Sequence, residues 1–375
     1  MRNFWEVVKD AYGRINPPTV ILLFIFPIVL CLGILSLFSA ETPRGLEVGV
    51  VAESGGSLEG KLLRAIEASP TTKLSMRCRS VSECASAMRS GKIYAFLHIP
   101  PDLEKKALRL EAPIITVYTN GQSLLTSKLI TNDLRTAIGT QGALLVKNTV
   151  APPITSELHV IGNPTGNYEY FLGVGFVVAL FHVIAMIFGA YIFSYPIRER
   201  ETSKWFSAAG NSTAVAFFGR FLPALFILGT EMVALFFLAR RGMPALKGID
   251  IAVLVCGIYA MVGTCLAAGA AFVGIIGEMR IALSAAAVAG GPAFAFCGQT
   301  FPIFAMPTVL RCWAFVLPIT HFMQLQSAFF LGHVGISRAF HSLEILGGEL
   351  LFWILVAILS LRIRIPRTVQ REAAE

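Results

Sequence analysis

The chain has 375 residues, of which 55% are hydrophobic and only 14% are charged, and its mean hydropathy is +0.68. Soluble domains contain about 45–50% apolar and about 25% charged residues, so this composition excludes an ordinary soluble protein. The formal net charge is +8. No basic stretch carries interleaved aromatic residues on a soluble face, so we attribute the basic excess to loops beside a membrane and expect no nucleic-acid partner.

The first 18 residues mix aromatic and apolar side chains with basic ones, and Asn16, Pro17 and Pro18 end this pattern. The mixture predicts a cytoplasmic amphipathic helix over residues 1–18 that lies on the membrane surface. An apolar run, Thr19–Ala40, follows, and we assign the first membrane span to residues 19–41. The run is longer than the roughly 7–15 apolar residues of a signal peptide, so we expect it to be retained.

Charges and turn residues return between residues 42 and 166, and no apolar run there reaches membrane length. Alternating strand and helix patterns predict a mixed α/β extracytoplasmic domain, large enough to bury its own core. The predicted strands are Leu46–Ala52, Lys73–Cys78, Ile93–Ile99 and Pro113–Tyr118. The predicted helices are Ser57–Ala68, Val81–Arg89 (capped by Ser80 or Ser82) and Ser123–Val150.

Cys78 and Cys84 are the two cysteines of this predicted domain. A disulfide between them is one interpretation, because disulfides persist outside the cytoplasm and a turn from strand to helix can bring two α-carbons close enough. Two buried free thiols are the other. The seven cysteines of the chain form no C-x-x-C pair and no His–Cys cluster with zinc spacing, so we expect no metal site.

Residues 167–365 are predicted to form a five-span transmembrane domain, followed by a cytoplasmic tail over 366–375. A re-entrant region is expected at 299–330, where Pro302, Pro307 and Pro318 rule out one straight helix. The predicted fold is therefore a polytopic α-helical membrane protein, with about six spans plus a re-entrant segment and an inserted mixed α/β extracytoplasmic domain. The five apolar runs are Tyr170–Tyr195, Ala214–Ala239, Ile251–Ile276, Ile281–Phe296 and Leu346–Leu361.

The distribution of Lys and Arg predicts that both termini of this multi-pass protein are cytoplasmic. With an even number of spans, the two ends share a side with the basic clusters around Arg198 and Arg364. The short loop with Arg240, Arg241 and Lys247 lies on the other side, and its basic residues are an exception to the enrichment of Lys and Arg in cytoplasmic loops.

The sequence contains no G-x-x-x-x-G-K-[ST] phosphate loop, no H-E-x-x-H motif and no G-x-S-x-G motif. We therefore expect this chain to be no enzyme, with no catalytic residue and no cofactor of its own. The most informative segment is 196–211, whose charged part is Arg198–Phe206. It is either a cluster of charges that stops membrane transfer or a short amphipathic segment that docks into a groove of a partner.

Glu231 and His182 are the candidate functional residues inside predicted spans. Glu231 is either a residue of the transport pathway or a polar group at a helix interface, because a carboxylate at that depth is costly. Arg220, eleven residues earlier, is about 16 Å away along the helix, which is too far for a direct pair. His182 is either a proton relay or a hydrogen-bonded packing residue, and His321 is expected to be structural.

The chain resembles the ABC-2 type permeases, specifically bacterial exporters with a large extracytoplasmic domain between the first two spans. The resemblance covers nearly the whole chain and is carried by Ile99–Leu103, Arg198–Thr202, Phe301–Pro307 and Leu317–Phe322. It implies that Arg198–Phe206 is a coupling helix for a separate ABC ATPase subunit, which binds ATP-Mg. The residues it assigns to this contact are Arg198, Glu199, Arg200, Glu201, Thr202 and Trp205.

The resemblance further implies a permease dimer, formed with a second copy or a paralogue, in contact with membrane lipid and two ATPase chains. A periplasmic adaptor protein is a further partner that this hypothesis allows. The alternative function is a non-transporting membrane receptor or scaffold whose external domain binds a ligand. A membrane-embedded acyl or glycosyl transferase lacks an evident acid/base pair. Drug-like cations, lipids and glycans all stay open as substrates.

Overall fold

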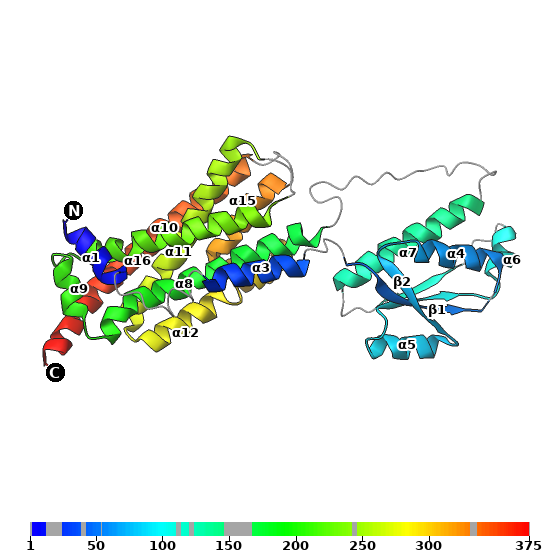
Figure 1. Cartoon of the computed structure of the whole chain (residues 1–375), viewed down its shortest axis with the longest axis horizontal. Helices are drawn as coiled ribbons and strands as arrows, with labels where there is room; N and C mark the ends of the chain where they lie inside the picture. Colours follow the sequence, from blue (N-terminus) through cyan, green and yellow to red (C-terminus); the bar gives the residue numbers. More distant parts are fainter. Residues whose placement is uncertain are drawn as a thin grey trace. The chain divides into compact units, whose positions relative to one another are not determined.

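The structure is a computed structural model that describes residues 2–12, 25–38, 43–53, 55–109, 114–119, 124–145, 167–241, 246–330 and 336–374. The chain divides into two compact units (Figure 1). One is helical and combines Met1–Ser39 with His159–Glu375, and the other is the α/β unit Ala40–Leu158.

The α/β unit contains one four-stranded sheet with the strand order β2-β1-β3-β4. β1 is parallel to both β2 and β3, whereas β4 pairs antiparallel with β3 at the edge. Helices α4 and α7 cover one face of the sheet and α5 covers the other (Figure 1). The elements in chain order are β1 (Leu46–Ala52), α4 (Ser57–Glu67), β2 (Thr72–Cys78), α5 (Val81–Arg89), β3 (Ala95–Ile99), α6 (Leu103–Leu108), β4 (Thr116–Thr119) and α7 (Leu124–Leu145).

The alternation of side chains along β1 builds a core on each face of the sheet, because successive residues of a strand point to opposite sides. Val48 and Val50 are buried with the side chains of α4 and α7. Val51 is buried on the other face, with α5. Gly49 also faces α5, where an added Cβ would lie 2.8 Å from the Cys84 Sγ atom.

The strand Leu46–Ala52 and the helix Val81–Arg89 have the bounds predicted from the sequence. Ser80, rather than Ser82, caps the helix: its hydroxyl accepts a hydrogen bond from the Glu83 backbone N–H at 3.3 Å. The edge strand starts later than predicted, at Thr116, and the predicted helix Ser123–Val150 is described only over Leu124–Leu145.

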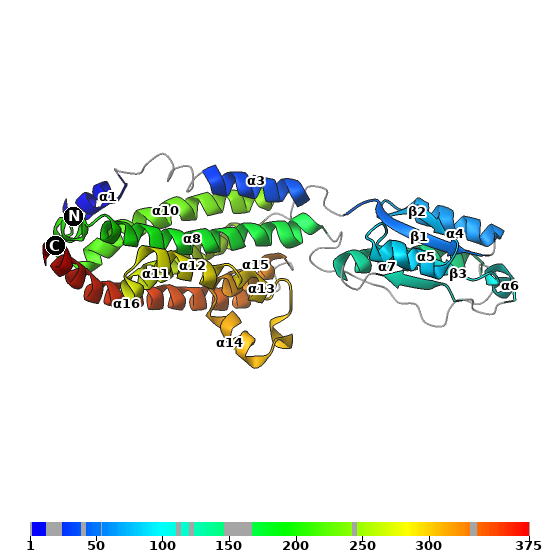
Figure 2. The same cartoon turned by 90° about the horizontal axis from the view of Figure 1, so that it is seen from below.

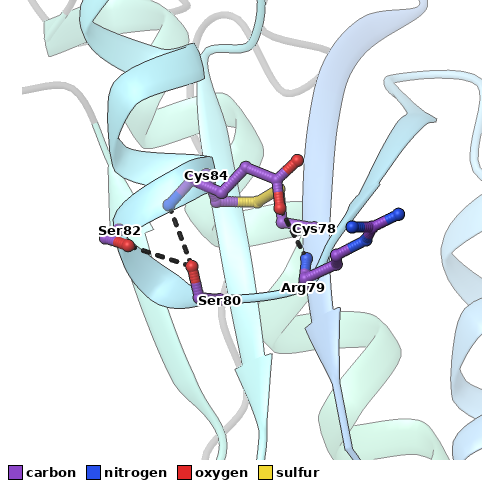
Figure 3. The surroundings of a disulfide bond; sticks show 6 residues. Cys78, Arg79, Ser80, Ser82 and Cys84 are labelled. Atoms are coloured by element: carbon purple, nitrogen blue, oxygen red, sulfur yellow. Dashed lines mark hydrogen bonds between the residues drawn. A yellow bond between two sulfur atoms is a disulfide. The ribbon is translucent and has the colours of Figure 1, made fainter.

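Cys78 and Cys84 are joined by a disulfide that ties the end of β2 to α5, with their α-carbons 5.6 Å apart (Figure 3). The intervening turn is held by two further contacts. The Arg79 backbone N–H donates to the Glu83 carboxylate at 2.8 Å, and the hydroxyls of Ser80 and Ser82 lie 2.9 Å apart. The bond therefore closes a short turn that is already well connected.

The helical unit contains five helical stretches that are long and apolar enough to cross a membrane, counted over the described residues. Each overlaps one of the apolar runs predicted from the sequence. Of the expected first span, 19–41, the structure describes residues 25–38, which include the shorter apolar helix Phe26–Leu37. The five stretches are Glu169–Arg198, Thr213–Ala239, Gly248–Ile276, Met279–Phe296 and Ala339–Ala374.

Helix α11 lies at the centre of this unit and packs against α8, α10, α12, α15 and α16 (Figures 1 and 2). Its small residues, including Ala267, Ala270 and Ala271, are fully buried, as expected for close helix packing. The helices of the unit are α1 (Arg2–Tyr12), α3 (Phe26–Phe38), η2 (Glu169–Gly173), α8 (Val174–Arg198), α9 (Thr202–Ala208), α10 (Thr213–Ala239), α11 (Gly248–Ile276), α12 (Met279–Gly290), α13 (Ala293–Phe296), η3 (Ile303–Ala305), α14 (Thr308–Val316), α15 (Pro318–Phe330) and α16 (Ile336–Ala374).

The region 299–330 is broken into short helices at its prolines. Pro302 precedes η3, Pro307 precedes α14, and Pro318 is the first residue of α15. Proline suits the start of a helix, because backbone N–H groups there have no partner within the helix and the N–H that proline lacks therefore costs no hydrogen bond. The prediction that this region is not one straight helix is confirmed.

Candidate functional site

The site is the α9 segment, which we define as residues 198–208, between the long helices α8 and α10. The chain turns on each side of α9. Arg200 and Asn211 both have a backbone φ of 58°, in the left-handed region. Asparagine is common there, whereas arginine is not, so the turn at Arg200 must be held by its surroundings. Part of that support is the hydrogen bond from the Glu201 N–H to the Pro196 carbonyl, at 2.9 Å.

Trp205 anchors α9 to the helical unit. Its side chain is fully buried and forms an edge-type contact with the Phe193 ring, at a centroid distance of 6.3 Å. The guanidinium carbon of Arg220 lies 4.9 Å from the centroid of the Trp205 ring, which is a cation–π contact. Arg220 also donates from Nη1 to the Ile192 carbonyl at 2.7 Å. The ring therefore fixes α9 against both α8 and α10.

Helix α1 supports the same region, because it packs against both α9 and α10. The Tyr12 hydroxyl donates to the backbone carbonyl of Arg220 at 2.8 Å, and Val7 is fully buried beside Gly219. Burial raises the pKa of Tyr12, so its hydroxyl stays protonated and remains a donor. In both views, α1, α9 and the end of α16 lie at the same end of the helical unit (Figures 1 and 2).

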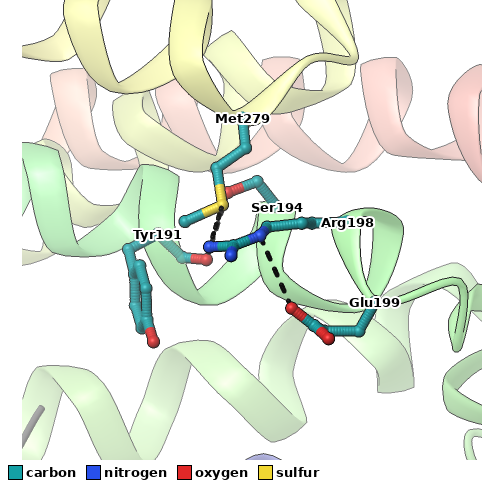
Figure 4. Close-up of polar contacts among 5 residues, drawn as sticks. All are labelled: Tyr191, Ser194, Arg198, Glu199 and Met279. Atoms are coloured by element: carbon teal, nitrogen blue, oxygen red, sulfur yellow. Dashed lines mark hydrogen bonds and ion pairs between the residues drawn. The ribbon is translucent and has the colours of Figure 1, made fainter.

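The charged side chains of the segment face outward. Arg198 is 62% exposed, its Nε atom lies 3.5 Å from the Glu199 carboxylate, and it donates from Nη1 toward the Met279 sulfur at 3.9 Å (Figure 4). Lys204 is 55% exposed and lies 3.8 Å from the Glu201 carboxylate. Such exposed pairs contribute at most about 1 kcal/mol to stability, so these charges are available for another role.

Glu231 is half-buried and His182 is buried, on different helices, and no contact joins them among the described residues. Both carboxylate oxygens of Glu231, on α10, are without a hydrogen-bond partner in the described part of the chain. His182, on α8, is fully buried, and its Nδ1 atom lies 3.8 Å from where a Cβ of Gly290 would be. Arg220, on the same helix as Glu231, contacts the Ile192 carbonyl and the Trp205 ring.

The sequence interpretation missed Glu349, which lies on α16 beside His321 of α15. The distance from its Oε1 to the His321 Nε2 is 3.5 Å, and the same Nε2 lies 2.9 Å from the Phe315 carbonyl. Glu349 is the only acidic residue in the run Leu346–Leu361, and that signal could have identified it. Within the described residues, no group of three His, Cys, Asp or Glu side chains could hold a metal ion.

Comparison with protein families decides the identity of the chain. The family model described as ABC-2 family transporter protein matches residues 18–359. The chain belongs to the ABC-2 transporter family. No curated protein matches it. Because the match includes both the apolar helices and the inserted α/β unit, this ABC-2 chain is a multi-pass membrane protein and a component of a membrane transporter, rather than itself catalytic.

Membership of the ABC-2 family implies association with an ABC ATPase subunit. Of the six residues predicted to contact that subunit, Thr202 and Trp205 are fully buried within this chain, and Trp205 anchors α9. Arg198, Glu199 and Arg200 are exposed and Glu201 is half-buried, so these four remain available.

Proposed function

We propose that this ABC-2 chain is the permease subunit of an exporter, which moves its substrate outward across a bacterial inner membrane. A separate ABC ATPase subunit would bind and hydrolyse ATP-Mg and would contact the α9 segment. The observation that carries the proposal is that the α9 segment is anchored by the buried Trp205, while the charges of Arg198, Glu199 and Lys204 are exposed. A rigid anchor with a charged outer face suits transmission of a partner's movement to α8 and α10.

The orientation follows from the same region. If α9 meets an ATPase, then α1, α9 and the end of α16, which lie together, are cytoplasmic, and both termini with them. Basic residues near the ends of the spans support this side. The unit Ala40–Leu158 is then extracytoplasmic, and its Cys78–Cys84 disulfide suits an oxidising compartment. In this arrangement, residues 299–330 form a re-entrant region.

The assembly we propose is a dimer of two permease chains with two ATPase chains. α16 has a row of exposed apolar side chains, including Leu351, Phe352 and Leu355, which suits contact with lipid or with a second permease chain. The second chain would be another copy or a paralogue, and a periplasmic adaptor would receive the substrate outside.

The first test is purification of the tagged chain in mild detergent, with identification of bound partners by mass spectrometry. We expect an ABC ATPase to co-purify and its ATP turnover to rise in the complex. Glu201→Ala should leave abundance and membrane insertion normal but reduce this stimulation, because the residue lies at the charged face of α9. Glu67→Ala, the same change at an exposed helical residue of the α/β unit, is the matched control.

Unchanged stimulation in Glu201→Ala would remove Glu201 from the contact. Absence of any ATPase from the wild-type preparation, together with binding of a ligand by the α/β unit, would instead favour a receptor or scaffold. The orientation is tested separately with single cysteines at the exposed positions Lys61 and Lys204, in a chain whose exposed Cys256 and Cys312 are changed to Ser. An impermeant maleimide added to spheroplasts should label only position 61, and the reverse pattern would invert the topology.

A further inference from the structure

The last turn of α16 contacts the first turn of α9, although 170 residues separate them in the sequence. The Glu372 carboxylate accepts two backbone hydrogen bonds there. The Thr202 N–H donates to Oε1 and the Ser203 N–H donates to Oε2, each at 3.1 Å. Both oxygens of one side chain are thus directed at adjacent amides of α9.

This contact replaces a cap that α9 does not have in its own sequence. The first amides of a helix have no partner within it and are usually paired by a side chain at the N-cap. The N-cap residue of α9, Glu201, makes no such side-chain hydrogen bond. A carboxylate at the positive end of the helix is favourable electrostatically, and hydrogen bonds to a charged acceptor are stronger than neutral ones. A helix of seven residues is also too short to be stable by itself.

The end of α16 is itself held against α11 by an arginine side chain. Arg364 donates from Nη2 to the Ile275 carbonyl at 2.7 Å and from Nε to the Gly274 carbonyl at 3.2 Å. These are among the last carbonyls of α11, and the residue that follows the helix, Gly277, is its C-cap and has a left-handed backbone conformation. Arg364 and Glu372 are about two turns apart on α16. Arg364 pairs with the C-terminus of α11, where a positive charge is favourable, and Glu372 pairs with the N-terminus of α9, where a negative charge is favourable.

We infer that Glu372 is a positioning residue, which joins α9 to the end of α16 so that the two move as one body when the ATPase acts on α9. The inference rests on the proposed function, because it takes α9 as the contact with the ATPase. Helix α16 runs from Glu349, which lies beside His321, past Pro366 to Glu372, a length of about 35 Å along the helix at 1.5 Å per residue. A movement of α9 would thus be passed to α15 through a single helix.

The first experiment measures the contact in the purified chain without any ATPase. Hydrogen exchange is compared between the wild type, Glu372→Ala, Glu372→Gln and the control Arg371→Ala, which removes an exposed charge one position earlier. Exchange at the Thr202 and Ser203 amides should rise about tenfold or more in Glu372→Ala, less in Glu372→Gln, and not at all in the control. Unchanged exchange in Glu372→Ala would overturn the inference.

The second experiment measures ATP turnover of the complex and includes a rescue. The parent chain has Cys256 and Cys312 changed to Ser, and the test chain carries Ser203→Cys and Glu372→Cys in addition. Under reducing conditions, the stimulated ATP turnover of the test chain should be about tenfold lower than that of the parent chain, at an unchanged KM for ATP. Oxidation should join the two cysteines and restore turnover, whereas the parent chain should respond equally under both conditions. Failure of the cross-link to restore turnover would refute movement as one body. If the wild-type chain stimulates no ATPase, the proposed function fails, but the exchange result on Glu372 is unaffected.

Discussion

Helices α8 and α11 approach so closely that their contact depends on two glycines. A Cβ added at Gly269 would lie 2.6 Å from the Ala190 backbone nitrogen and would also clash with the Met186 carbonyl. A Cβ at Gly189 would lie 2.9 Å from the Leu266 carbonyl carbon. All of these atoms are backbone, so no side chain can rotate away to make room. Small residues at such a crossing let membrane helices pack by close van der Waals contact.

The size of the effect of Gly269→Ala follows from these distances. The added methyl group falls 0.8 Å short of ordinary contact (3.4 Å) at the Ala190 nitrogen and still further short at the Met186 carbonyl, so the helices must separate by more than 0.8 Å. Overpacking of this kind costs about 1–3 kcal/mol, and we take the upper value because the obstacle is backbone. Alanine recovers about 1 kcal/mol through its higher helix propensity. We therefore expect a net loss of about 2 kcal/mol in the free energy of unfolding.

The assay is thermal unfolding of the purified chain in detergent, followed by the loss of the monodisperse peak on size exclusion. Gly347→Ala in α16 is the matched control, because a Cβ there would meet no atom within 4 Å. The control should unfold at the wild-type temperature or slightly above it, whereas Gly269→Ala should unfold several degrees lower. A Gly269→Ala protein as stable as the control would refute the argument from backbone contact.

Three further predictions concern other parts of the chain. Cys78→Ser should destabilise the α/β unit by about 2 kcal/mol, because the closed loop is short, and a reducing agent should erase the difference from the wild type in a melting experiment. Trp205→Ala should cost about 3–5 kcal/mol by leaving a cavity under α9 and should raise proteolysis within residues 199–212, with Trp205→Phe intermediate; equal cleavage of both variants and the wild type would contradict its role as an anchor. Glu349→Lys should prevent accumulation of folded protein because it places a second basic group beside His321, whereas Glu349→Gln should accumulate; normal yields of Glu349→Lys on a membrane blot would show that the site is not enclosed.

The positions of the long helices and of most α/β elements could be predicted from the sequence, because the signals that specify them are local. An apolar run of membrane length can be recognised from one continuous stretch of about 20 residues, as Tyr170–Tyr195 and Ile251–Ile276 show. The alternation in Leu46–Ala52 and the serine before Val81–Arg89 likewise specify a strand and a helix start within a few residues. The charged segment around Arg198 was identified for the same reason.

The sequence alone also indicated that the α9 segment is short, charged and placed between two long apolar helices. It could not determine which of its side chains face inward. Trp205 and Lys204 are neighbours, yet one is fully buried and the other is exposed, because Arg220 and Phe193 happen to cover only one side of α9.

Only the tertiary structure decided the contacts between residues far apart in the chain. Glu372 lies in a tail that its sequence marks as merely charged, and its role as the cap of α9 depends on where α16 ends. The same holds for Glu349 beside His321 and for Gly269 beside the backbone of α8. Such pairings depend on how whole helices pack, and no local pattern of residues encodes the distance between two helices that dozens of residues separate.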